Sequence, residues 1–169
     1  EGRGRTGVSV FARRVGLGGG LGLGGLAVVL AAALTLWLGW PATMTFEVGS
    51  GQTGVAGAWI AAPAGQTLPL VFSDGSQVVL DGGSRARVED LEPDGARVVH
   101  ESGGADVSVV ARTEAAWRLG AGPFEVHVTG TAFHLSWVPA EEVFVLVLDH
   151  GSVEVTGPVL GPRKALEVG

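Results

Sequence analysis

The sequence predicts an all-β fold, an antiparallel β-sandwich or β-roll of short strands and hairpins, preceded by one transmembrane α-helix. Three observations support this fold class: an uncharged run at residues 15–40, a two-residue hydrophobic period over most of the following chain, and turn sequences at short intervals. No helical pattern of about ten residues interrupts the alternating part. We therefore expect the residues beyond the run to form a single β domain.

The uncharged run from Val15 to Trp40 is long enough to cross a membrane. A helix of this length rises about 39 Å, whereas the hydrocarbon core of a bilayer is about 30 Å thick. Four arginines and one acid precede the run, and seven bases and sixteen acids follow it. Because short basic flanks stay in the cytoplasm and tryptophans such as Trp37 settle at the far interface, residues 41–169 are expected on the outer side.

Two other interpretations of this run are open. The arginine pair at residues 13–14 and the alanines at residues 31–33 also fit a cleaved signal peptide, but the chain stays apolar after the alanines, which favours an uncleaved anchor. A buried helix of a soluble protein seldom runs so long without a charge.

The run also contains a glycine repeat. Glycine is common in membrane helices, yet three glycines of the run also repeat at the small-xxx-small spacing of close helix packing: Gly16, Gly20 and Gly24.

Composition sets the remaining boundaries. The expected segments are a short basic cytoplasmic segment (1–14), the membrane span (15–40), a tether with edge strands near Phe46 and Trp59 (41–69), the β domain (70–157) and a C-terminal tail (158–169). The chain has no cysteine, so disulfides, thiolate metal sites and thiol nucleophiles are excluded. The acidic balance after the run argues against nucleic acid and anionic lipid headgroups as partners.

Alternation of apolar and polar residues predicts half-buried strands, for example over residues 152–156. Residues 143–148 (VFVLVL) are apolar on both faces, which predicts a central strand covered on both sides, with Val145 and Val147 buried. The Asp149-His150-Gly151 sequence then predicts a tight turn that returns the chain as a hairpin.

No catalytic residue, cofactor or metal site is predicted, and we do not expect an enzyme. The four histidines are the candidate bases and ligands, and they are expected to be solvent-exposed because no HxH, HxxxH or carboxylate spacing joins them: His100, His127, His134 and His150. Ser73 and Ser76 are expected to cap their own turn. The acidic run at residues 89–94 is typical of a solvated hairpin tip rather than a calcium loop.

Three blocks of the β part resemble one family. They are FSDGSQVVL (72–80), PFEVHVTGTAFHL (123–135) and VLVLDHGSVEV (145–155). They are similar to the DGS, PF-x-V, GT-x-F and EG-x-V signatures of the FecR family of transmembrane regulators, in the family's order. The residues that carry the resemblance are Asp74, Gly75, Ser76, Pro123, Phe124, Val126, Gly130, Thr131, Phe133, Gly151 and Val153.

The resemblance implies a bacterial inner-membrane protein with a cytoplasmic N-terminus and a periplasmic sensing domain that signals to a cytoplasmic sigma factor through an N-terminal anti-sigma region. Only fourteen residues precede the run, so we expect that region to be truncated here. There is also no room after Thr156 for the second small α/β lobe of iron-signalling members, and residues 124–130 are short enough for one continuous strand. The alternative is a membrane-tethered periplasmic scaffold or binding module with an envelope partner and no sigma factor.

Overall fold

The computed structural model describes residues 43–158 and 161–167. The chain divides into two units, residues 1–40 and 41–169, and all the described residues belong to the second. The predicted membrane span and its glycine repeat therefore lie outside the described residues. Within the described ranges, no helix has the length and apolarity to cross a membrane.

All regular secondary structure in these ranges is β-strand, which confirms the all-β prediction. The strands are β1 (Phe46–Val48), β2 (Gln52–Thr53), β3 (Trp59–Ala61), β4 (Leu68–Phe72), β5 (Gln77–Leu80), β6 (Arg85–Glu92), β7 (Gly95–Ser108), β8 (Trp117–Ala121), β9 (Phe124–Val128), β10 (Ala132–Val138), β11 (Val143–His150), β12 (Ser152–Gly157) and β13 (Gly161–Glu167). Glycine-containing turns separate most neighbours, as expected from the sequence.

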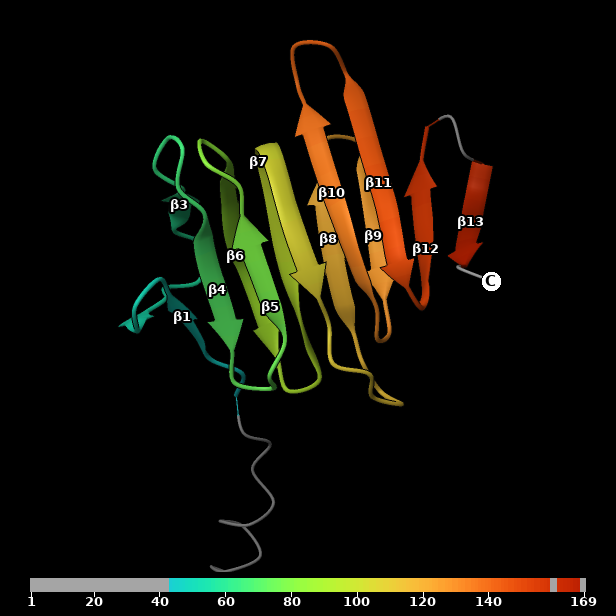
Figure 1. Cartoon of the computed structure of the whole chain (residues 1–169). Helices are drawn as coiled ribbons and strands as arrows, with labels where there is room; N and C mark the ends of the chain where they lie inside the picture. Colours follow the sequence, from blue (N-terminus) through green and yellow to red (C-terminus); the bar gives the residue numbers. More distant parts are fainter. Residues whose placement is uncertain (1–42, 159–160, 168–169) are drawn as a thin grey trace, which may run out of the picture. The chain divides into compact units, whose positions relative to one another are not determined.

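The long strand β7 belongs to two sheets (Figure 1). Its first part pairs with β6 and β8, and its last part pairs with β5 and β10. We call the sheet ordered β2-β1-β4-β5-β7-β10-β11 the first sheet, and the sheet ordered β3-β6-β7-β8-β9-β12-β13 the second sheet. A single strand thus connects two hydrogen-bonded surfaces.

The inner faces of the two sheets bury a common apolar core. Phe72 of the first sheet meets the edge of Trp117 of the second, with ring centroids 4.7 Å apart. Phe124 of the second sheet stacks on Phe144 of the first at 4.7 Å. Full burial of each side chain of this size contributes about 1.5–3 kcal/mol. The largest buried core residues are Trp117, Phe46, Phe133, Leu70, Leu80, Leu119 and Leu135.

Strand β7 changes sheets at Gly103 and Gly104. Gly103 has a φ of 91°, and a Cβ there would lie 2.8 Å from the Cα of Ser84. A Cβ on Gly104 would lie 2.2 Å from a carboxylate oxygen of Asp81. The buried hydroxyl of Ser84 accepts a hydrogen bond from the Gly104 N–H at 2.9 Å. Glycines are therefore needed where the strand bends against the β5–β6 turn.

One ladder differs from the antiparallel prediction. Strands β7 and β8 are parallel, with Arg97 opposite Arg118, whereas every other ladder of the described strands is antiparallel. The bend in β7 makes this possible, because the strand leaves the second sheet and residues 109–116 bring the chain back beside its start. The Ala116 N–H then donates to the Asp94 carbonyl at 3.1 Å. We call residues 109–116 the crossover loop.

The prediction of a central strand at residues 143–148 is wrong. Strand β11 pairs with β10 alone among the described strands and forms an edge of the first sheet. Its side chains alternate, so that Val145 and Val147 remain 43% and 53% exposed while Phe144 and Leu146 turn inward. A run that is apolar on both faces does not distinguish a covered strand from an edge strand with an apolar outer face.

The predicted hairpin at residues 149–151 is also wrong. Strand β12 pairs with β9 and β13, not with β11, so the chain crosses from the first sheet to the second at Gly151. Gly151 has a φ of 88°, and a Cβ there would lie 2.8 Å from the Gly130 carbonyl oxygen. The glycine therefore permits a close backbone approach between the sheets rather than a hairpin turn. Residues 124–128 form one strand, and β13 adds a strand within the predicted tail.

Two glycines of the same backbone conformation test the bend. Gly83→Ala should lower the free energy of unfolding by about 1–2 kcal/mol, because its φ is 86° and no atom lies near the new methyl group. Gly103→Ala should cost about 1–3 kcal/mol more, because its methyl group also meets Ser84. Urea unfolding followed by tryptophan fluorescence measures both. Equal losses would show that the bend tolerates a side chain.

Candidate functional site

The Asp74-Gly75-Ser76 turn holds the crossover loop. The Asp74 carboxylate accepts bonds from the Ser76 N–H at 2.8 Å and the Ser76 hydroxyl at 2.9 Å. It also accepts a bond from the indole N–H of Trp117 at 3.2 Å, and the Ser76 hydroxyl oxygen accepts the Val110 N–H at 3.1 Å. Asp74 and Ser76 therefore close their own turn, as expected, whereas the Ser73 hydroxyl accepts the distant Thr45 N–H at 3.1 Å, contrary to expectation. The same turn links the first sheet to β8.

A second contact holds the loop from the other side. The N–H and carbonyl of Thr131 pair with those of Val109 at 3.2 and 2.9 Å. The Thr131 hydroxyl donates to the Ser152 carbonyl at 2.7 Å. A Cβ on Gly130 would lie 2.4 Å from the Cβ of Ala111, so this glycine lets the loop pass. The DGS and GT-x-F residues thus contact one loop, and Thr131 links them to Ser152 of the G-x-V segment. We call this arrangement the crossover clamp.

The Pro123-Phe124 block lies away from the clamp. The ring of Phe124 lies between Phe144 and the edge of Trp137, at centroid distances of 4.7 and 6.1 Å. Val126 and Phe133 are buried in the core, as Val153 is. Phe124, Val126, Phe133 and Val153 therefore pack in or against the interior, whereas Pro123 is exposed.

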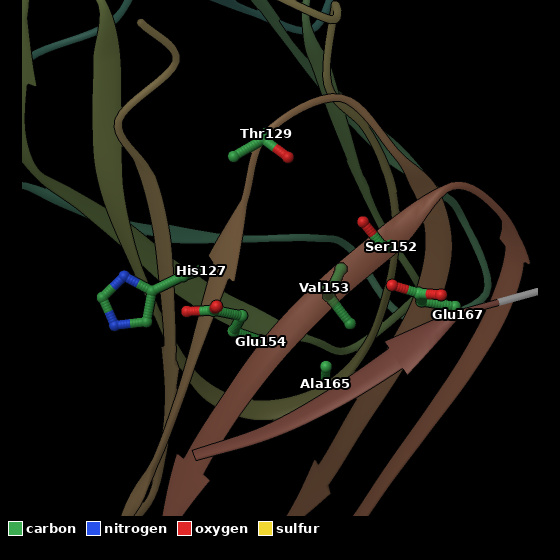
Figure 2. Close-up of a pocket in the computed structure, with 7 residues that line it drawn as sticks. All are labelled: His127, Thr129, Ser152, Val153, Glu154, Ala165 and Glu167. Atoms are coloured by element: carbon green, nitrogen blue, oxygen red, sulfur yellow. The ribbon is translucent and has the colours of Figure 1, made fainter. Parts of the chain in front are cut away.

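A shallow groove lies beside the crossover clamp, on the outer face of the second sheet. It consists of two hollows of about 240 and 400 Å³, and His127 and Thr129 line both. Figure 2 shows the first hollow, where the Glu154 carboxylate turns toward the His127 ring on the neighbouring strand. Ser152, whose carbonyl accepts the Thr131 bond, lies on its wall. We call this feature the His127 groove.

The elements that frame the groove explain its position. Thr129 directly precedes the Gly130-Thr131 pair, and Ala115 and Ala116 at the end of the crossover loop line the second hollow. A change in the clamp would therefore move the groove walls. Its hydroxyl, imidazole and carboxylate groups can exchange hydrogen bonds with a polar or basic partner.

Ion pairs cover much of the outer face of the second sheet near this groove. Arg97 lies between Glu89 at 3.2 Å and Glu125 at 3.7 Å, and Arg118 contacts Glu92 at 2.9 Å. Exposed pairs of this kind contribute about 0–1 kcal/mol each. They keep this face polar. The antiparallel pairing of β6 with β7, with Glu92 opposite Gly95, confirms that the acidic run at residues 89–94 belongs to a hairpin end.

The histidines do not converge. His127 and His134 lie on outer faces, as expected, and the His134 Nδ1 is 2.9 Å from Asp106. His100 contradicts the expectation of exposure, because it is only 2% exposed and its Nε2 has no hydrogen-bond partner among the described residues. No group of three potential metal ligands occurs in the part of the chain that the structure describes.

Burial lowers the pKa of His100 below its ordinary value of 6.5. Its hydrogen bond to the Gly103 backbone and the nearby charge of Asp81 act in the opposite direction, and His134 adds to the lowering. The neutral imidazole is therefore part of the folded core beside the bend of β7. The alternation of the β7 sequence indicates this burial, since His100 follows buried Val98 by two residues.

Comparisons with known proteins give a fold and no family. No protein-family model matches the chain, and no curated protein matches it in sequence. Two crystal structures of a "putative anti-sigma factor" from Parabacteroides distasonis match with TM-scores of 0.58 and 0.57. The sequence identity is 22% in each match. Each match covers 65% of this chain and 51% of the neighbour's chain. The likeness is one of fold. This chain spans about half the length of those proteins.

Asp74→Ala tests the crossover clamp. The change removes the acceptor of the Trp117 and Ser76 donors, so the free energy of unfolding should fall by about 1–3 kcal/mol. Asp106→Ala is the control, because its pair with His134 is exposed and should contribute about 0–1 kcal/mol. Urea unfolding compares the two variants, and similar losses would show that the clamp does not hold the loop.

The buried imidazole predicts a dependence of stability on pH. Because the unfolded chain binds the His100 proton near pH 6.5 and the folded chain only at lower pH, the free energy of unfolding should fall as pH drops below 6.5. One such group gives a slope of up to about 1.4 kcal/mol per pH unit. His100→Gln should remove this part of the slope in urea titrations from neutral to acidic pH. An unchanged slope would contradict the assignment.

Proposed function

We propose that this chain is part of a single-pass inner-membrane regulator whose β domain is periplasmic and controls a cytoplasmic sigma factor. The observation that carries the proposal is the crossover clamp: residues of two FecR-like signatures hold one loop, and a third signature is bonded to them through Thr131, in a fold shared with an anti-sigma factor candidate. The uncharged run at residues 15–40, with arginines before it, supports a cytoplasmic N-terminus.

In this proposal the β domain senses and does not catalyse. The His127 groove is the input surface we assign to it, because its walls include the end of the crossover loop and the strands fixed by Thr131. A ligand that binds the groove more tightly in one arrangement of the loop would shift the domain toward that arrangement. The signal then passes along the chain to the membrane span and to an anti-sigma region N-terminal to it.

The topology has its own test. An alkaline-phosphatase fusion after Gly157 should be active and should sediment with membranes, because basic residues precede the span. Activity in the soluble periplasmic fraction would show that residues 15–40 are a cleaved signal and would remove the anchor from the proposal.

The regulatory role is tested in the full-length gene product. A tagged protein purified from membranes should recover a sigma factor, and deletion of residues 70–157 should change transcription of a small set of genes while membrane insertion persists. Asp74→Ala, which weakens the clamp, should change the same genes, whereas Asp106→Ala should not. Recovery of envelope proteins without a sigma factor, with no change in transcription, would instead favour the tethered scaffold.

A further inference from the structure

Within the described residues, the two sheets have four edge strands: β2, β3, β11 and β13. Three of these edge strands are poor templates for pairing with another strand. Strand β2 has two residues and β3 has three. The sequence of β13 contains Pro162 and Lys164, a proline and a charge of the kind that protects sheet edges. Strand β11 has eight residues, and the six at 143–148 contain neither a charge nor a proline. It is the one long unprotected edge in this part of the chain.

The outer face of this edge is apolar. Val143, Val145 and Val147 are 42%, 43% and 53% exposed. Their neighbours on β10 are Val138, Ser136 and His134, and of these three only His134 forms an ion pair within the described residues, with the carboxylates of Asp106 and Asp81. The outer face of the second sheet, in contrast, is covered by arginine–carboxylate pairs. Strand β13 approaches β11 without forming a ladder with it. An edge strand of this kind leaves a row of backbone N–H and C=O groups for a further strand.

Charge at the two ends of β11 selects the occupant. Glu141 and Glu142 precede the strand, and Asp149 lies near its end. An antiparallel pair of two identical copies that matches Val143 with Val147 would bring Glu141 opposite Asp149 twice. Like charges directly opposite each other are unfavourable. A partner strand with basic residues at both ends would instead place a positive charge opposite Glu141 and another opposite Asp149, which is favourable.

We propose that β11 is a docking strand for an extended segment of another protein, with an uncharged, β-branched middle and lysine or arginine at each end. The backbone of that segment continues the first sheet, and its alternate side chains cover Val143, Val145 and Val147. The acidic residues at the ends of β11 pair with the basic residues at the ends of the docking segment, and these pairs fix the register between the two strands. This surface lies on the first sheet, apart from the His127 groove, and the inference does not depend on the proposed regulation of a sigma factor.

The test uses the full chain in detergent micelles and a labelled peptide, Lys-Lys-Val-Thr-Val-Thr-Val-Thr-Lys-Lys. Fluorescence anisotropy should show binding about tenfold tighter than that of the same core flanked by glutamates. Hydrogen exchange of the backbone amides at residues 143–148 should slow when the peptide binds. Slowed exchange elsewhere, or equal binding of both peptides, would overturn the proposal.

Two matched variants separate strand addition from general attraction to an acidic protein. Val145→Lys places a charge on the docking face and should weaken binding about tenfold. Val71→Lys adds the same charge to another partly exposed valine of the same sheet and should leave binding within about twofold. Val147→Lys replaces the first variant if that one is unfolded by circular dichroism. Equal effects at positions 145 and 71 would overturn the proposal, as would a dimer of the free chain that protects residues 143–148.

Discussion

The passage of β7 from one sheet to the other is the constraint on which the rest of this domain depends. The strand can bend only where the backbone approaches the β5–β6 turn without side chains, and the hydrogen bond from Gly104 to the Ser84 hydroxyl fixes that approach. Both sheets form around this strand, and their inner faces then meet across Phe72 and Trp117. The parallel pairing of β7 with β8 follows from the same bend.

The crossover clamp explains why polar side chains such as those of Ser76 and Thr131 are buried beside an apolar core. Asp74 and Ser76 accept hydrogen bonds from Trp117 and from the crossover loop. Without Asp74 the indole N–H of buried Trp117 would lose its partner, at a cost of about 1–3 kcal/mol. Gly130 allows the loop to pass, and Thr131 connects it to β12. These residues hold the loop in place, and the groove beside them is the surface that we propose for a ligand.

The sequence predicts the all-β class because alternation and turn residues are local patterns, and the faces of His127 and His134 follow from the same alternation. The partners of the DGS turn could not be predicted. Its bonds to Val110 and Trp117 span 34 and 43 residues, and such contacts leave no local pattern. The exposure of Val145 was missed for a related reason. A strand that is apolar on both faces can lie either at the centre or at the edge of a sheet, and the sequence pattern does not distinguish the two positions. The predicted span at residues 15–40 stays a prediction.

The order of strand pairing also determines how this domain can form in time. Strand β9 can pair on its second side only after β12 has formed, and the last part of β7 can pair on its second side only after β10 has formed. Neither sheet can be completed from the first hundred residues alone. Non-local pairing of this kind gives folding times of about milliseconds to seconds in small all-β domains. During that interval the VFVLVL segment has no sheet to join, so rapid capture of β11 by β10 is a kinetic requirement for avoiding aggregation.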